Sequence, residues 1–236
     1  MKRLLILLAL PLAMLLAQCT TPGMENRLSK MEAKQDSILK LLGGMQEKHE
    51  YMAMRMGWRP PADTSPKVIP VGTSYSTGPE KALLTIVEFS DLQCPYCSQF
   101  APILDSIAHA YPNEVRVIFK NFPLSFHPQS RPAAAAAIAA GKQGKFFEFR
   151  YKVAPHFRDL KDSVYLAVAK EIGLNLEQFK KDMALTPEIT GILDADAELG
   201  RRIGVEGTPT IFVNGKLAQD RSYEYFVRMI AQAKGG

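Results

Sequence analysis

The chain has 236 residues, of which 47% are hydrophobic and 22% are charged, so it is long and apolar enough to form a folded core. Its net charge of +5 comes partly from the N-terminal segment, and no basic stretch is interleaved with aromatic residues, which speaks against nucleic-acid binding. Three cysteines and four scattered histidines supply no second ligand pair for zinc, and we expect neither a metal nor an organic cofactor.

Residues 1–18 are typical of an export signal. The charged start Met1–Arg3 precedes the apolar run 4–17, which is short for a transmembrane helix of about 20 residues. The segment 16–19 resembles a bacterial lipobox in which Cys19 would be lipidated, although a glutamine replaces the small residue usual before the cysteine. We therefore expect export to the periplasm or cell surface, with a membrane anchor through a lipid at Cys19.

Residues 19–57 predict an N-terminal helix, and within it 25–56 keep one heptad register. Positions a and d of this register are mostly apolar, which predicts a coiled coil through which copies of the chain associate. The alternative is a single helix that spaces the next domain from its anchor. The a positions are Leu28, Gln35, Leu42, His49 and Met56, and the d positions are Met31, Ile38, Met45 and Met52.

The Pro-rich segment 58–66 predicts a stiff linker, and 67–236 is expected to be one domain. Near its start the sequence predicts a strand over 83–90 and a helix over 99–110, with the motif CPYC between them. A helix N-terminus presents unpaired N–H groups and the positive end of the macrodipole, which stabilise a thiolate. We therefore expect Cys94 to be the nucleophile with a lowered pKa, and Cys97 to be the resolving thiol.

A second signal lies near the C-terminus, where GTPT at 207–210 precedes the apolar run 211–213 and then Asn-Gly. A proline is tolerated at the start of a strand, and Asn-Gly between extended runs is a strong hairpin signal. An ordinary loop-to-strand junction remains the alternative for Thr208-Pro209.

The intervening residues are predicted to be helical. Pro132 followed by alanines up to Gly141 predicts one helix, and Asn175 with Gln178 resembles a capping box that begins another. Apolar residues recur at helical spacing behind the Thr-Pro at 186–187, namely Ile189, Ile192, Leu193 and Leu199.

In this order, the motifs resemble a thioredoxin-fold protein of the DsbA-like family. The resemblance covers Val68 to Ala233 and rests on 85–91 leading into the CPYC motif, on 119–124 and on 204–210. It implies an α/β thioredoxin fold with an inserted helical domain at about 123–205, preceded here by the coiled-coil-like helix.

The resemblance also implies roles for individual residues. Pro209 would follow a cis peptide bond, and Thr208 and Pro209 would hydrogen-bond the extended chain of a substrate beside Cys94. Glu88 occupies the position of a buried acid that accepts the proton of the resolving thiol, and Lys120 is its expected partner. Alternation along the strand does not decide which face is buried, so an outward-facing Glu88 is the alternative.

Pro95 and Tyr96 lie between the cysteines, where they would contact the substrate and set the reduction potential. The motif CPYC is found in glutaredoxins and some isomerase-like proteins, whereas strongly oxidising DsbA proteins more often have histidine in place of Tyr96. Thr208 also resembles the isomerase branch.

We therefore expect an exported thiol–disulfide oxidoreductase that acts on the thiols or disulfides of proteins and needs a membrane redox partner. Three interpretations remain open: a monomeric oxidase, a homo-oligomeric isomerase or reductase, and a non-catalytic surface lipoprotein whose thioredoxin domain is a binding module.

Overall fold

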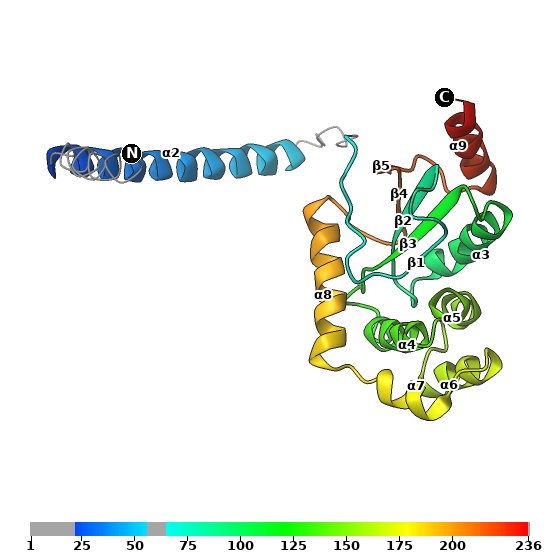
Figure 1. Cartoon of the computed structure of the whole chain (residues 1–236). Coiled ribbons are helices and arrows are strands. Elements are labelled where there is room, and N and C mark those ends of the chain that lie inside the picture. The colour runs from blue at the N-terminus through cyan, green and yellow to red at the C-terminus, as the bar shows by residue number, and fades with distance from the viewer. Residues whose placement is uncertain (1–21, 56–64, 236) are drawn as a thin grey trace, which may run out of the picture. The chain divides into compact units, whose positions relative to one another are not determined.

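The computed structural model describes residues 22–55 and 65–235 (Figure 1). The chain consists of two compact units, and the boundary between them falls between residues 63 and 64. The first unit contains helix α2 (Pro22–Arg55), whose 34 residues correspond to about 50 Å. The expected signal peptide, Cys19 and most of the linker lie outside the described residues, as do the side chains of His49, Met52 and Met56.

The second unit is built on one five-stranded sheet with the strand order β1-β3-β2-β4-β5. The central strands β2 and β3 are parallel, whereas β1 pairs antiparallel with β3, β4 with β2, and β5 with β4. The strands are β1 (Ser76–Thr77), β2 (Leu84–Ser90), β3 (Val115–Asn121), β4 (Thr210–Val213) and β5 (Lys216–Leu217).

The helices of this unit cover both faces of the sheet and continue into a helical insertion between β3 and β4 (Figure 1). They are α3 (Pro95–Ala110), α4 (Ser130–Lys142), α5 (Phe146–Val153), the 3₁₀ turn η1 (Ala154–His156), α6 (Asp162–Glu171), α7 (Leu176–Asp182), α8 (Pro187–Arg202) and α9 (Tyr223–Gly235).

Alternate residues of the central strands contact different helices. Leu84 and Ile86 of β2 are buried with residues of α3 and α9, whereas Val87 and Phe89 are buried with residues of α8. Since side chains alternate along a strand, Glu88 lies on the α3 face with Ile86. Both faces of β2 are therefore covered, as expected for a parallel central strand.

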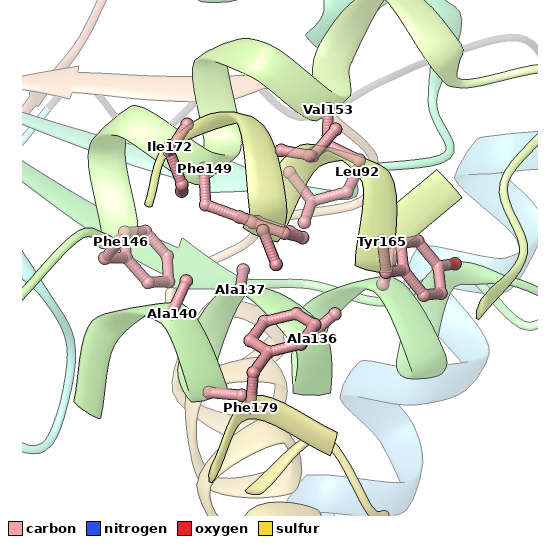
Figure 2. Packing of buried hydrophobic residues seen from close by; sticks show 14 of the residues in the cluster. Leu92, Ala136, Ala137, Ala140, Phe146, Phe149, Val153, Tyr165, Ile172 and Phe179 are labelled. Carbon is pink, nitrogen blue, oxygen red and sulfur yellow. The ribbon is translucent and has the colours of Figure 1, made fainter. Parts of the chain in front are cut away.

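The helical insertion has its own core, in which aromatic side chains of α5 and α7 pack on the alanines of α4 (Figure 2). The rings of Phe149 and Phe179 have centroids 5.6 Å apart. Both lie close to Ala136 and Ala137, whose small side chains leave room for these rings. The alanine run of the sequence is thus the surface on which the insertion assembles.

One local prediction is confirmed in detail, and another is met in part. The Asn-Gly turn joins β4 to β5, with φ of 47° at Asn214 and 78° at Gly215. The side chain of Asn175 accepts the N–H of Gln178 over 3.0 Å and caps α7. The return bond of a capping box is not formed, because the N–H of Asn175 donates to the side chain of Gln143 over 2.9 Å instead.

The fold class predicted from the sequence, a thioredoxin fold with a helical insertion, is confirmed by this topology. No helix within the described residues has both the length and the apolar character that a membrane span requires.

Candidate active site

The two cysteines lie at the start of α3, directly after the carboxyl end of β2. Cys94 is the N-cap residue, with an extended backbone (φ −73°, ψ 125°), and Pro95 is the first helical residue. Proline suits this position because a first-turn residue has no helical acceptor for its N–H. The N–H of Cys94 donates to the Asp91 carbonyl, and its own carbonyl accepts the N–H of Ser98, both over 3.0 Å.

Both thiols are free and buried, but their surroundings have opposite effects. A hydrogen bond from the Cys97 thiol is the main cause that lowers the pKa of Cys94 to about 5, and Thr208 and the N–H groups of Tyr96 and Cys97 add to it. The pKa of Cys97 is raised by burial first, then by its bond to Cys94 and by the charge of Glu88. Cys94 is therefore the readily formed thiolate, and Cys97 holds its proton.

Glu88 is fully buried on the α3 face of the sheet, so the outward-facing alternative is wrong. Its carboxylate accepts the hydroxyl of Ser90 over 2.8 Å and is paired with the guanidinium of Arg150 from α5. Burial raises the pKa of Glu88, and Arg150 and Ser90 offset part of that rise. Glu88 is thus a buried acid close enough to Cys97 to affect its pKa, and its own raised pKa allows it to take up a proton.

The expected partnership of Glu88 with Lys120 is wrong. In the parallel pairing of β2 and β3, Glu88 lies opposite Phe119, and Lys120 lies opposite Phe89 on the other face. Lys120 donates there to Asp196 of α8 over 3.0 Å and to the Val71 carbonyl over 2.8 Å. Its role in the structure is to fix α8 to the sheet, whereas Arg150 takes the place beside the acid.

The loop before β4 faces the cysteines. The Thr208–Pro209 peptide bond is cis, as the resemblance implied, and the Thr208 carbonyl lies 3.4 Å from the Cys94 sulfur. A groove of about 450 Å³ runs beside this loop, and its walls include Tyr96, Leu217 and Arg221. Tyr96 is 65% exposed, so an apolar ring is presented next to the reactive thiol.

Asp91 joins the turn before Cys94 to a neighbouring loop. Its carboxylate is buried and accepts the N–H groups of Gln93 and Leu124 and a ring nitrogen of His127, over 2.7 to 3.0 Å. The side chain of Gln93 in turn accepts the N–H of Gln129 over 2.6 Å. The turn before Cys94 is thus fixed to the loop between β3 and α4.

The site therefore brings together seven of the eight residues predicted in this domain to act in catalysis or substrate binding, all except Lys120, and adds one that was missed. The seven lie around one end of β2 and β4, namely Glu88, Cys94, Pro95, Tyr96, Cys97, Thr208 and Pro209. The missed residue is Arg150. The sequence did contain a signal for it, because Phe146, Phe149, Arg150 and Val153 form one buried helical stripe with a cation in the middle.

Comparison with known proteins gives a family match over most of the chain. The thioredoxin family model Thioredoxin_4 matches residues 71–232. Among solved structures, a thioredoxin-like oxidoreductase from Silicibacter pomeroyi is 28% identical with a TM-score of 0.58, covering 70% of this chain and 94% of that chain. BdbD from Bacillus subtilis has a TM-score of 0.62 and 24% identity, covering 74% of this chain and 100% of that chain.

The curated relatives with similar sequence are much longer proteins. Na(+)/H(+) antiporter NhaA 3 of Salinispora tropica is 35% identical over 140 residues, which are 59% of this chain and 21% of the antiporter. The chain thus spans about a fifth of the length of the curated relatives that it matches.

Proposed function

The chain belongs to the DsbA-like thioredoxin-fold family, and we propose that it is a thiol–disulfide oxidoreductase that acts on exported proteins through Cys94 and Cys97. The observation that carries this proposal is the placement of the two thiols: Cys94 is the N-cap residue of α3, 3.4 Å from the Thr208 carbonyl, and Cys97 is buried one turn later. This placement lowers the pKa of Cys94 to about 5 and raises that of Cys97. A disulfide exchange needs one ready nucleophile and one thiol held in reserve.

In the reducing direction, the Cys94 thiolate attacks one sulfur of a substrate disulfide. The bond between Cys94 and that sulfur forms, the substrate S–S bond breaks, and the other substrate sulfur leaves as a thiolate. Cys97 then attacks the Cys94 sulfur, so that a Cys94–Cys97 disulfide forms and the second substrate thiolate leaves. The substrate is reduced by two electrons, and the same steps in reverse oxidise a substrate dithiol.

The second step requires that Cys97 lose its proton. Glu88 is the acceptor that we propose, because it is buried beneath Cys97 and its raised pKa brings it closer to that of a thiol. Arg150 replaces Lys120 as the cation that keeps Glu88 able to ionise.

The groove beside the cis-Pro209 loop is the proposed site for the substrate chain. Thr208 and Pro209 offer backbone groups next to Cys94, and Tyr96 and Leu217 offer apolar walls. A peptide that lies extended along this loop would place its cysteine against Cys94.

We further propose that the protein is exported and anchored through a lipid at Cys19, and that a membrane redox partner restores its working state. Helix α2 favours the homo-oligomeric isomerase or reductase over the monomeric oxidase. In support, Leu28, Met31, Ile38, Leu42 and Met45 at the a and d positions are all more than half exposed.

The experiment that tests catalysis is capture of the mixed disulfide. A Cys97→Ala variant should accumulate protein substrates joined to Cys94, since the resolving thiol is gone, and the adducts should dissolve on reduction. The Cys94→Ala variant is the matched control and should capture none. If neither variant captures substrates from a cell extract, the catalytic proposal fails.

The second candidate, a binding module without catalysis, predicts a different outcome. A Cys94→Ala variant would then keep the full biological effect of the protein in cells.

A further inference from the structure

The groove beside the Pro209 loop carries two opposite charges. Arg221, from the segment before α9, and Glu206, from the loop before β4, both line the groove, and both side chains are exposed. Within residues 65–235 neither of them belongs to an ion pair. Both charges are therefore available to a chain that lies in the groove.

The backbone of Arg221 is held in place by the residues around it. The carboxylate of Asp220 accepts the N–H of Arg221 over 2.6 Å and the N–H of Ser222 over 3.1 Å. It also accepts the hydroxyl of Ser222 over 2.7 Å, and the oxygen of that hydroxyl accepts the N–H of Tyr225 in the first turn of α9 over 3.3 Å. The Asp220 carboxylate thus has three hydrogen-bond partners, and the guanidinium of Arg221 is not one of them.

The guanidinium of Arg221 reaches the Pro209 loop instead. Its Nη1 donates to the Pro209 carbonyl over 3.4 Å, which is a long hydrogen bond. A guanidinium has five N–H donors, and among the described residues this is the one hydrogen bond that the side chain of Arg221 makes. Arg221 therefore keeps most of its donors for another acceptor.

A substrate that lies extended along this loop brings a defined side chain to Arg221. Cys94 and Arg221 contact consecutive residues of the loop, the carbonyls of Thr208 and Pro209. In an extended chain, side chains two positions apart point to the same side and are separated by about 6.6 Å. When the substrate cysteine meets Cys94, the side chain two positions away therefore lies within reach of the long side chain of Arg221.

The group that suits Arg221 best is a carboxylate. A planar guanidinium forms two parallel N–H···O bonds with a carboxylate, and the opposite charges strengthen both of them. A neutral amide offers one oxygen and no charge, and a lysine side chain would meet a like charge. Glu206 in the same groove repels an acidic side chain at its own position, so the groove distinguishes where along the substrate the acid lies.

We propose that Arg221 is a specificity-determining residue that binds a carboxylate of the substrate chain. The protein would then prefer cysteines that have an acidic side chain two positions away in the sequence. The charges are exposed, so the effect is a preference and not a strict requirement. This inference rests on the proposed function and adds the class of substrate.

The test uses the full chain in its reduced form and short peptides whose single cysteine is joined by a disulfide to 2-thiopyridine. The Cys94 thiolate attacks the peptide sulfur, so that the bond between these two sulfurs forms, the bond to the pyridine sulfur breaks, and pyridine-2-thiolate leaves. The absorbance of this product gives the rate. Dividing by the rate of mercaptoethanol with the same peptide removes the effect of the peptide charge on the disulfide itself.

The peptides carry Glu, Gln or Lys two positions before the cysteine in one set and two positions after it in the other. In one of the two sets the parent chain should react about fivefold faster with the Glu peptide than with the Gln peptide, the scale of an exposed ion pair. The Lys peptide of that set should react more slowly than the Gln peptide. Added salt should reduce these differences, because it screens exposed charges.

Variants then assign the preference to one side chain. Arg221→Gln should lower the rate with the Glu peptide to that with the Gln peptide, and Arg221→Lys, which keeps the charge, should retain part of the difference. Glu206→Gln should raise the rate with the Glu peptide, since it removes a negative charge from the groove. Arg228→Gln is the matched control, because it removes the same charge from an exposed position of α9 that does not line the groove, and it should keep the preference.

The outcomes separate the substrate preference from the function itself. If the parent chain reacts with no peptide faster than mercaptoethanol does, the proposed function fails. If it reacts faster but equally with the Glu and Gln peptides of both sets, or if Arg221→Gln keeps the preference, the role of Arg221 is wrong and the function stands. Loss of the preference in Arg228→Gln as well would assign it to the net charge of α9 and would also overturn the role of Arg221.

Discussion

Cys94 and Cys97 are one helical turn apart, and the hydrogen bond between them is the largest cause of the low pKa of Cys94. Cys97→Ala removes that donor, so the pKa of Cys94 should rise from about 5 toward the ordinary thiol range. Cys97→Ser keeps a hydroxyl donor and should hold the pKa closer to that of the parent chain. Thiolate absorbance near 240 nm as a function of pH measures both, and equal titrations in the two variants would contradict this assignment.

The same shift makes the stability of the reduced protein depend on pH. The pKa of Cys94 in the folded reduced state, about 5, lies below the value of about 8.5 in an unfolded chain. The stabilisation is therefore complete above about pH 8.5 and is lost as the pH falls through about 5. Urea unfolding at several pH values should show that the free energy of unfolding of the reduced form rises, relative to that of the oxidised form, as the pH increases between these limits. A difference in free energy that does not change with pH would contradict this prediction.

At the level of single residues, the sequence predicted the roles of the two cysteines better than it predicted the buried residues around them. The two thiols and the cis-Pro209 loop belong to short motifs with fixed spacing. The partner of Glu88 depends on which strand residues share a face and on how the insertion packs. Lys120 is on the strand next to that of Glu88, but its side chain lies on the opposite face of the sheet. Arg150 is on a helix of the insertion, 62 positions from Glu88 in the sequence.

Helix α8 offers a matched pair of glycines at the scale of an element. A Cβ at Gly200 would lie 2.8 Å from the ring of Phe122 and 3.0 Å from that of Phe89, so Gly200→Ala should destabilise the fold by about 1–3 kcal/mol. A Cβ at Gly191 meets nothing within 4 Å, and Gly191→Ala should stabilise α8 by about 0.5–1 kcal/mol. Chemical denaturation measures both. Equal effects would mean that α8 does not pack on β2 as described.

Local sequence patterns predict which segments form helices and strands, but they do not predict at which residues these elements begin and end. Strand β3 continues beyond its apolar residues to Asn121, because the polar Lys120 and Asn121 are buried by their bonds to Asp196. The helix predicted from residue 99 begins at Pro95, since the CPYC motif is its first turn. Such tertiary partners cannot be read from the periodicity of one segment.

For the whole molecule, the untested prediction is association through α2. Leu42 is at an a position and is 56% exposed in the single chain, so Leu42→Lys would place a charge in the shared core of a coiled coil. Sedimentation velocity of the chain from Thr20 should show an oligomer for the parent and a monomer for this variant. Ser37→Lys adds the same charge at an outward c position and should leave the oligomer intact. A parent chain that sediments as a monomer would contradict the proposal.

The most direct test of the central claim is the reduction potential of the Cys94–Cys97 pair, measured by equilibration with glutathione, alkylation and mass spectrometry. A low pKa of Cys94 stabilises the reduced form, so we expect a potential between about −120 and −230 mV, the range of disulfide-exchange enzymes from DsbA to glutaredoxins. A value below about −300 mV, typical of structural disulfides, would contradict the assignment of these thiols as an exchange centre.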